Sequence, residues 1–517
     1  MLRPQPFVLI MKTEPFVSPN RFRGYRPKPV VAGLFLLLTS NQWLLACGVG
    51  IITALIGWPY YSQISIWVGV ALFLVGVTVV HFRYAAQYII PFPHIAILIA
   101  ALQYVLAAWV SHSYPNDSPM YNIGARLPKY LPFATLVLLA CATGWGLGLA
   151  GMRIPLRRAT IKATPDLLLS LDALLVFGFL NVPLARITQG TSLAFLFILL
   201  ACLRYVGVYG RMICRGTGWT WRLAVVLVGE MLYSATGGMF HNLLLWTAWS
   251  FALWSYLYRP AWSTILIAIV GGMLLLPPIQ AAKLALREEI WDTSKHVIDS
   301  DLRSSFKKSS FWLTVVGSQT RQMSAGHLDA DLFSETVVRL NQGWIVDRVM
   351  EHVPKYEPYA RGKTLKNAFI SALVPRLFYP HKVITGGLEN MEKYAGLTLD
   401  DETSMNLGYA GEMYANFGYW GGIIGCSLYC LAFALLFRAV CIRAFVSPLW
   451  WSIIPYIGYT ALKAEDDIVG VVNWTSKACV VLAAIIFTFP AFRRALFAKS
   501  SRSIIHQSSA DERQVRI

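Results

Sequence analysis

The sequence predicts an all-α, polytopic integral membrane protein with a large polar loop between two blocks of transmembrane helices. Two observations support this fold class. Of the 517 residues, 56% are hydrophobic and only 14% are charged, whereas about a quarter are charged in a typical soluble domain. A helix needs about 20 mostly apolar residues to span a bilayer, and the chain contains about twelve such runs.

The apolar runs divide the chain into five regions. The predicted spans lie at 38–58, 64–82, 93–111, 131–150, 167–185, 192–210, 219–236, 239–257, 262–284, 410–436, 449–466 and 473–493. The predicted regions are an N-terminal tail (1–29), a first transmembrane block (30–284), a loop (285–409), a second transmembrane block (410–493) and a C-terminal tail (494–517). No internal repeat relates the two blocks, as an inverted-repeat transporter would require.

The distribution of charge predicts how the chain is oriented. Lys and Arg outnumber Asp and Glu by 45 to 27, and the formal charge is +18. The basic residues gather in the tails and in short connections, so they indicate orientation beside anionic lipid and not a surface for nucleic acid. With the N-terminus inside, the short loops with most basic residues also fall inside. Both termini are therefore predicted to be cytoplasmic, with the 285–409 loop on the outer side.

The cysteines and the N-terminus exclude a secreted disulfide scaffold. All eight cysteines lie in or beside apolar runs, and the polar loop has none. Cys426 and Cys430 are one helical turn apart without a nearby histidine, which favours helix packing over metal binding. The Pro-rich, basic leader lacks the pattern of a signal peptide and is interpreted as a cytoplasmic tail. We expect no metal and no cofactor.

The polar loop contains an amphipathic segment. Apolar residues recur at helical spacing from Leu332 to Met350, with Asp329, Asp331 and Glu335 near its start and Pro354 after its end. Acidic residues near a helix start complement its dipole, and proline ends a helix. The sequence therefore predicts a helix within this loop.

Two stretches flank the end of the loop and share their spacing with a known family. The first is RLNQGWIVDRVMEHVPKYEPYARGKTLKNAFISALVPRLFYPHK, from Arg339 to Lys382, and the second is GYAGEMYANFGYWGG, from Gly408. Together they resemble the Wzy-type oligosaccharide repeat-unit polymerases of O-antigen and exopolysaccharide synthesis. The matching positions are Arg339, Val353–Pro354, Pro358–Tyr359, Gly362, Val374–Arg376, Pro380, Lys382, Gly411–Glu412 and Asn416–Gly418.

The resemblance implies a GT-C-like glycosyltransferase in the bacterial inner membrane, with its active site facing the periplasm. Such enzymes polymerise oligosaccharide repeats carried on undecaprenyl diphosphate, a lipid-linked substrate. The implied partners are therefore that lipid-linked oligosaccharide, membrane lipid and a polysaccharide co-polymerase that regulates chain length. Nucleic acid is not an expected partner.

A departing lipid diphosphate needs fixed cations, and arginine binds phosphate through two parallel hydrogen bonds. Arg376, Lys382 and Arg339 are the leading candidates, although each also fits a solvated loop charge or a lipid anchor. Arg321, Arg348 and Arg361 are weaker candidates. Aromatic residues near the outer face fit either an interfacial belt or a sugar platform.

Ionisable residues inside predicted spans are costly, so each is a site hypothesis. Arg204 and Arg211 share one helical face and are expected to reach one cavity, where either can bind diphosphate or glycan. Arg211 also fits a snorkelling residue at the cytoplasmic surface. Glu230 is expected to form an ion pair with one of them, and His241 to be an interfacial hydrogen-bonding residue.

Glu412 is the candidate general base, one turn before Asn416, which would orient the acceptor sugar. Its alternative role is to complement the dipole of the helix that it begins, and Asp400 or Asp401 is the alternative base. Two other functions stay open. An O-antigen ligase would use a histidine late in the loop, here His381, and a lipid-linked oligosaccharide flippase would use charged helices along a central path.

Overall fold

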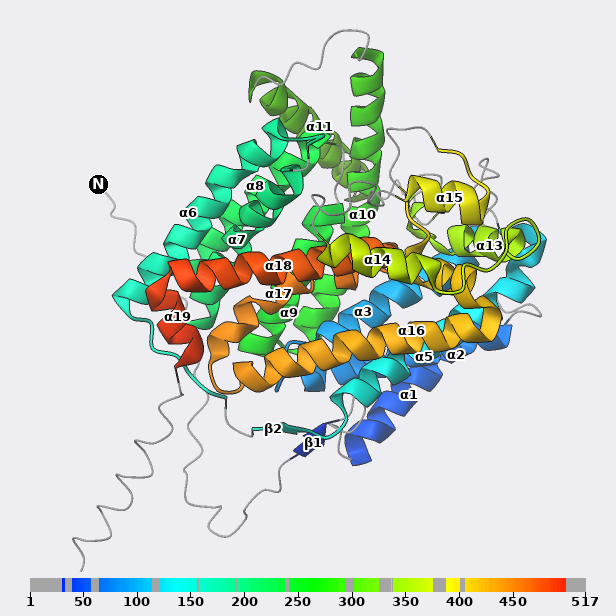
Figure 1. Ribbon diagram of the computed structural model, residues 1–517, viewed down its shortest axis with the longest axis horizontal. Helices are drawn as coiled ribbons and strands as arrows, with labels where there is room; N and C mark the ends of the chain where they lie inside the picture. The colour runs from blue at the N-terminus through cyan, green and yellow to red at the C-terminus, as the bar shows by residue number, and fades with distance from the viewer. Residues whose placement is uncertain are drawn as a thin grey trace, which may run out of the picture.

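The structure is a computed structural model of an all-α protein (Figure 1). It describes residues 30–32, 40–56, 65–113, 121, 123–155, 158–191, 193–237, 241–293, 302–324, 336, 338–374, 387–399 and 405–498. Among these residues, eight helices are long and apolar enough to cross a membrane. The membrane-embedded fold class is therefore confirmed, while the predicted number of twelve spans stays a prediction.

The first transmembrane block is a series of helices near the predicted positions. They are α1 (Ser40–Ile56), α2 (Ser65–Ala85), α3 (Phe92–Ala100), η3 (Ala101–Leu106), α4 (Ala107–Ser113), η5 (Gly124–Arg126), α5 (Leu127–Leu149), α6 (Pro165–Ile187), α7 (Ala194–Ile213), α8 (Trp219–Gly237), α9 (His241–Tyr258) and α10 (Trp262–Thr293). A short antiparallel sheet pairs β1 (Val30–Ala32) with β2 (Met152–Ile154), which ties the chain before α1 to the chain after α5.

The loop and the second block complete the fold. Their elements are α11 (Leu302–Ser324), α13 (Gly343–His352), α14 (Lys363–Leu373), α15 (Leu388–Ala395), α16 (Gly408–Ala444), η6 (Pro448–Ser452), α17 (Ile454–Ile457), η7 (Thr460–Leu462), α18 (Ile468–Thr488) and α19 (Pro490–Phe497). Figure 1 shows α13 and α15 at one end of the molecule and α19 at the opposite end. Along the sides, α16 packs on α5, α6 on α7, and α14 on α18.

Small residues let the long helices approach closely. A Cβ atom at Gly144 of α5 would lie 2.2 Å from the Ser427 carbonyl oxygen, and one at Gly148 would lie 2.3 Å from the Ala434 Cβ. Two glycines four residues apart therefore form the contact of α5 with α16. This is how helices associate in a membrane, where close van der Waals packing replaces the hydrophobic effect.

Helix α16 is two helices joined by a reversal at Gly418, where φ is 71° and ψ is −162°. Only glycine adopts this backbone conformation readily. The segment Gly408–Phe417 folds back on the following helix, so that the Tyr409 and Tyr429 rings stack 5.0 Å apart. A Cβ at Gly422 would lie 3.2 Å from the Tyr414 backbone. Gly422 therefore packs against the segment that immediately precedes the reversal.

The predicted span at 449–466 is not a continuous helix. In its place the chain forms η6, α17 and η7, three short pieces whose residues are almost all buried. Pro448, Pro455 and Gly458 interrupt the hydrogen-bond ladder that a single helix would need. Irregular backbone of this kind is tolerated inside a helix bundle only where protein surrounds it.

The amphipathic helix predicted in the loop is α13, which ends at His352 before Pro354. Its apolar face, with Trp344, Ile345 and Val349, is buried. Ahead of it, the Gln342 N–H donates to the Gln103 carbonyl oxygen at 3.0 Å, within the π-helical turn η3. Asp329, Asp331 and Glu335 lie outside the described residues.

An ion-pair cluster attaches α13 to the start of α5. The Arg126 guanidinium donates to the Asp347 carboxylate at 2.7 and 2.8 Å, and it lies 2.9 Å from the Glu351 carboxylate. The Asp347 side chain is only 4% exposed, whereas that of Glu351 is 39% exposed. Asp347 is therefore the buried anchor of the loop, and Glu351 is its solvated neighbour.

Candidate functional site

A polar cavity of about 190 Å³ lies inside the bundle, among α6, α7, α8, α9, α18 and the irregular segment around η7. Its polar lining consists of Arg204, Glu230, Tyr233, Asn242, Tyr459, Thr460 and Lys463. Ionisable side chains between membrane spans are expensive to bury, which makes this cavity the leading functional candidate in the described part of the chain.

Arg204 is the most deeply placed cation of this cavity. Its guanidinium forms an ion pair with Glu230 and donates to the Ala201 carbonyl oxygen at 2.8 Å. The Tyr205 hydroxyl donates to the same Glu230 carboxylate at 3.0 Å. Helix α6 packs closely on α7 at this point, since a Cβ at Gly178 would lie 2.4 Å from the Arg204 backbone nitrogen. The predicted ion pair of Glu230 with one of the two arginines is thus confirmed for Arg204.

The cavity has stacked aromatic walls. Tyr205 and Trp246 stack with ring centroids 3.6 Å apart, and Trp246 stacks on Tyr459 at 4.6 Å. Trp474 of α18 lies 4.9 Å from Tyr459. The Tyr459 hydroxyl is held by the Asn242 side-chain oxygen at 2.5 Å. These contacts fix the ring planes, and Trp246 is buried between Tyr205 and Tyr459.

A second cation and two buried polar atoms complete the cavity. The Lys463 ammonium lies 3.5 Å from the Asp466 carboxylate and 5.5 Å from the centroid of the Tyr459 ring. The Arg204 Nε and the Thr460 Oγ1 are both buried and have no hydrogen-bond partner within the described part of the chain. Buried polar atoms usually have partners, so these two are unsatisfied polar groups beside the cavity.

Arg211 is placed differently from Arg204. Its guanidinium binds both oxygens of Asp172, which Arg222 also binds at 2.9 and 3.0 Å. Arg211 is not among the residues that line the cavity of Arg204. The two arginines share one helix face, as predicted, but the structure does not bring them to one cavity. In this position Arg211 joins α6, α7 and α8 at one end of the bundle.

Glu412 and Asn416 lie on the folded-back segment of α16. The Glu412 carboxylate is fully buried and accepts the Ile468 N–H at 2.8 Å, at the start of α18. Asn416 accepts the Gly362 N–H at 2.9 Å and donates to the Thr364 hydroxyl at 2.7 Å. Both side chains therefore join α16 to neighbouring elements, and neither lines the cavity described above.

The remaining candidates are distributed over the loop. Arg376, His381, Lys382, Asp400 and Asp401 lie outside the described residues. Arg339 is half-buried just before α13. Of the weaker candidates, Arg348 pairs with Glu351 at 3.4 Å, Arg321 is exposed, and the Arg361 N–H donates to the Asn416 carbonyl oxygen at 3.1 Å. His241 is exposed at the start of α9.

Four residues that line the cavity were not predicted from the sequence: Lys463, Tyr459, Thr460 and Asn242. Lys463 was open to prediction because it falls inside the apolar run 449–466, where a lysine is costly. The other three have a weaker local signal, because a neutral polar or tyrosine side chain is far less costly inside a span than a charged one.

Comparison with protein-family models, with curated proteins and with solved structures finds no match for this chain. The fold and the cavity therefore define the class as an all-α membrane protein with a polar intramembrane cavity. The resemblance to the repeat-unit polymerases rests on the residues between Arg339 and Gly418 and stays a prediction.

Proposed function

We propose that this protein is a membrane glycosyltransferase that polymerises undecaprenyl-diphosphate-linked oligosaccharides into a surface polysaccharide. The observation that carries the proposal is the cavity in which Arg204, Lys463 and stacked aromatic rings converge. The resemblance between residues 339 and 418 supplies the reaction class. The proposed setting is the bacterial inner membrane, with the reaction at the periplasmic side.

The proposed chemistry needs positive charge beside the leaving group. When a sugar hydroxyl displaces the glycan from its carrier, the lipid diphosphate keeps the bonding electrons and the negative charge. Donors placed where charge develops are often worth about 3 kcal/mol each. In the proposal Arg204 and Lys463 meet the diphosphate, and the stacked rings of Trp246, Tyr459 and Trp474 form an apolar wall beside it.

In this proposal Glu230 balances the charge of Arg204 and orients its guanidinium. A lone buried arginine would be unstable, and Glu230 compensates its charge in the absence of ligand. Glu230 binds the guanidinium through its terminal nitrogen, and the Arg204 Nε forms no hydrogen bond within the described residues. Glu230 is therefore a positioning residue, since it orients the guanidinium without contacting the reacting atoms.

Glu412 stays a hypothesis as the general base. Its burial and its bond to the Ile468 N–H support the structural role, because a carboxylate at a helix start stabilises that helix. A catalytic role requires the folded-back segment of α16 to move and admit the acceptor. Arg376, Lys382 and Arg339 stay proposed ligands for phosphate on the loop side, with Asn416 as the residue that orients the acceptor.

A second function is favoured by one specific observation. The ion pair of Arg204 with Glu230 lies in a cavity between membrane spans, as charged residues do along the path of a transporter. A lipid-linked oligosaccharide flippase is therefore the second candidate. It leaves the resemblance of residues 339–418 without an explanation. The third candidate, an O-antigen ligase, would need His381 as its catalytic histidine, and His381 lies outside the described residues.

Deletion of the gene, followed by analysis of cell-surface and lipid-linked glycans, tests the proposal. Loss of a polymerase leaves single repeats on the lipid A core. Loss of a ligase instead leaves long polymer on the lipid carrier, and loss of a flippase leaves repeats on the cytoplasmic side. Complementation with the intact gene is the control, and a normal ladder of chain lengths in the deletion strain would exclude the proposal.

A further inference from the structure

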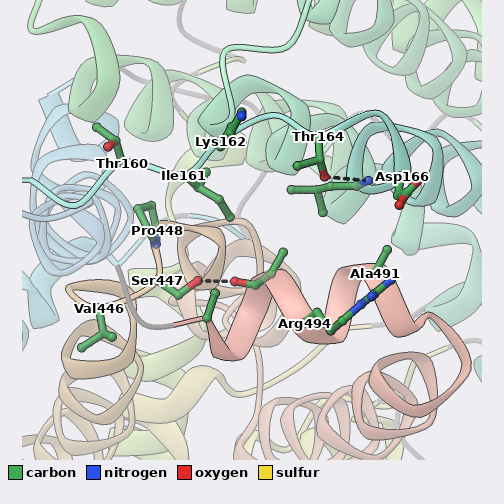
Figure 2. Close-up of a pocket in the computed structure, with 13 residues that line it drawn as sticks. Thr160, Ile161, Lys162, Thr164, Asp166, Val446, Ser447, Pro448, Ala491 and Arg494 are labelled. Atoms are coloured by element: carbon green, nitrogen blue, oxygen red, sulfur yellow. Dashed lines mark hydrogen bonds between the residues drawn. The ribbon is translucent and has the colours of Figure 1, made fainter. Parts of the chain in front are cut away.

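A second hollow of about 410 Å³ lies between the chain that leads into α6 and the helix α19 (Figure 2). One wall comes from Thr160, Lys162, Thr164 and Asp166, and the opposite wall from α19. We call this hollow the α6–α19 groove. Its volume is within the range of about 300–1,000 Å³ that is usual for small-molecule sites.

The groove lies at a membrane surface. Three of the apolar helices end around it: α6 begins at Pro165, α16 ends at Ala444 and α18 ends at Thr488. The following helix, α19, is short and carries Arg493 and Arg494. A groove at the common end of three membrane spans opens at the level of lipid head groups.

Two hydroxyl groups of the groove, those of Thr164 and Ser447, already have internal partners. The Thr164 hydroxyl accepts the Leu167 N–H at 3.4 Å and so caps α6, while the Ser447 hydroxyl donates to the Ala495 carbonyl oxygen at 2.8 Å (Figure 2). These bonds make the walls rigid. They also leave the charged side chains as the groups available to a ligand.

The two walls carry opposite charges. Figure 2 shows Asp166 on the α6 wall and Arg494 on the α19 wall, with Lys162 further along the first wall and pointing away from α19. Within the described residues neither Asp166 nor Arg494 forms an ion pair, so their charges face the groove without mutual compensation. Apolar lining residues, including Ile161, Val446 and Pro448, lie beside them.

We propose that the α6–α19 groove binds the head group of a zwitterionic aminophospholipid. The lipid phosphate binds Arg494 through charge-assisted hydrogen bonds, and the ammonium group binds Asp166. The apolar lining contacts the glycerol and the first carbons of the acyl chains. An anionic lipid without an ammonium group meets the same arginine but is repelled by Asp166. This proposal does not depend on the glycosyltransferase proposal.

The test measures lipid selectivity of the purified full-length protein. The protein is reconstituted with equal amounts of phosphatidylethanolamine and phosphatidylglycerol, extracted gently, and its retained lipids are counted by native mass spectrometry. We expect phosphatidylethanolamine to be retained at least about threefold over phosphatidylglycerol, the scale of one exposed ion pair. Equal retention, or preference for phosphatidylglycerol, would overturn the proposal.

Substitutions on the two walls have different expected effects. Asp166→Asn should abolish the preference while total retention persists, and Arg494→Gln should lower retention of both lipids. Arg493→Gln is the matched control, because Arg493 is exposed on the same helix but does not line the groove. An unchanged preference in Asp166→Asn, or equal retention by Arg494→Gln and Arg493→Gln, would contradict the assignment.

Soluble competitors distinguish a lipid site from a phosphate site. Inorganic phosphate and free phosphoethanolamine are added separately to the lipid-loaded protein. Persistence of the lipid in millimolar inorganic phosphate is the expected result, because acyl-chain contacts add to the head-group contacts. Displacement of the lipid by inorganic phosphate alone would show a phosphate site and overturn the lipid assignment.

Discussion

At the residue scale, the Arg204–Glu230 pair is the most consequential contact, because two charges are buried together among membrane spans. Removing one member leaves the other charge buried without compensation, which commonly costs about 3–5 kcal/mol. We therefore expect Arg204→Leu to lower the free energy of unfolding by about that amount. The measurement is equilibrium unfolding in detergent micelles.

The double variant Arg204→Leu/Glu230→Leu is the control for this prediction. Replacing a buried ion pair with apolar residues of similar volume is often close to neutral, so most of the lost stability should return. If the double variant is as unstable as Arg204→Leu, the cost does not arise from an uncompensated charge. In the proposed function the double variant folds but does not transfer glycan.

Glu412 gives a second prediction at this scale. Its carboxylate accepts the Ile468 N–H, and a glutamine side-chain oxygen can accept the same bond. If Glu412 has only this structural role, Glu412→Gln should therefore retain near-normal glycan transfer. Glu412→Ala leaves the buried N–H without a partner and should cost about 1–3 kcal/mol. Loss of transfer in a stably folded Glu412→Gln protein would instead indicate a general base.

Helical periodicity predicted some residue contacts and not others. It placed Arg204 inside a span and led to the expected pair with Glu230. It also placed Arg211 on the same helix face as Arg204. Seven residues rise about 10 Å along a helix, however, and this distance places Arg211 beyond the cavity that Arg204 lines. Asp172 on α6 binds Arg211 there. Contacts with another helix depend on packing, which periodicity alone does not describe.

At the element scale, the reversal at Gly418 shapes the second transmembrane block. Its left-handed φ is strained for any residue with a Cβ, at about 1–3 kcal/mol, and a Cβ there would lie 3.0 Å from the Tyr359 hydroxyl. Gly418→Ala should therefore lower the melting temperature. Gly271→Ala in α10, where no atom lies within 4 Å of the added methyl group, is the control and should not lower it. Equal changes of melting temperature in the two variants would contradict a backbone reversal at Gly418.

The attachment of α13 predicts a contrast between two carboxylates. Asp347 is buried and bonds to Arg126, so Asp347→Ala should cost about 1.5–3 kcal/mol. Glu351 is well exposed, and its pair with Arg126 should be worth under about 1 kcal/mol. Hydrogen exchange of α13 measures both effects. Greater exchange in Glu351→Ala than in Asp347→Ala would exclude the proposed anchor.

The pH dependence of this anchor has a definite sign. Burial is the main cause that raises the pKa of Asp347 above its ordinary value of 3.8, and the hydrogen bond from Arg126 opposes it. The folded state then binds the proton more tightly than the unfolded state, so this group's contribution to stability is lost as pH rises through the folded pKa. Relative to the unsubstituted protein, Asp347→Asn should gain stability as the pH rises above about 4. A difference in stability between the two proteins that does not change with pH would contradict a raised pKa of Asp347.

The positions of the transmembrane helices were predicted better than whether each helix is continuous. Most predicted spans coincide with helices, because a long apolar run has few other stable structures in a bilayer. The reversal within α16 was not predicted, since the apolar run continues through Gly418. The run 449–466 was long enough to span, but its prolines divide it into short pieces. Apolar length alone does not specify a continuous helix.

At the scale of the whole molecule, the orientation in the membrane is a prediction from the basic residues. A cysteine at Ser318, exposed on α11, should react with an impermeant thiol reagent added from outside, whereas one at Ser503 in the C-terminal tail should not. Labelling of the unsubstituted protein is the background, because Cys479 is exposed. The reverse pattern would overturn the orientation and move the proposed site to the cytoplasm.

The all-α membrane fold was predictable from composition and apolar length, whereas the cavity was only partly so. It brings together side chains from α7, α8, α9 and the segment before α18, which are separated by up to some 260 positions in the chain. Arg204, Glu230 and Lys463 could be selected locally, because their charge is unusual inside an apolar run, and only the first two were predicted. The aromatic walls depend on the tertiary packing of helices.

The most direct test is glycan transfer by the purified protein in lipid vesicles supplied with an undecaprenyl-diphosphate-linked oligosaccharide. The lipid-linked products are separated by size. A polymerase should give a ladder of products that grows by one repeat at a time, and the Arg204→Leu/Glu230→Leu protein should give no ladder. Lipid-linked oligosaccharide that keeps its original size, with intact and correctly folded protein, would contradict the proposed polymerase.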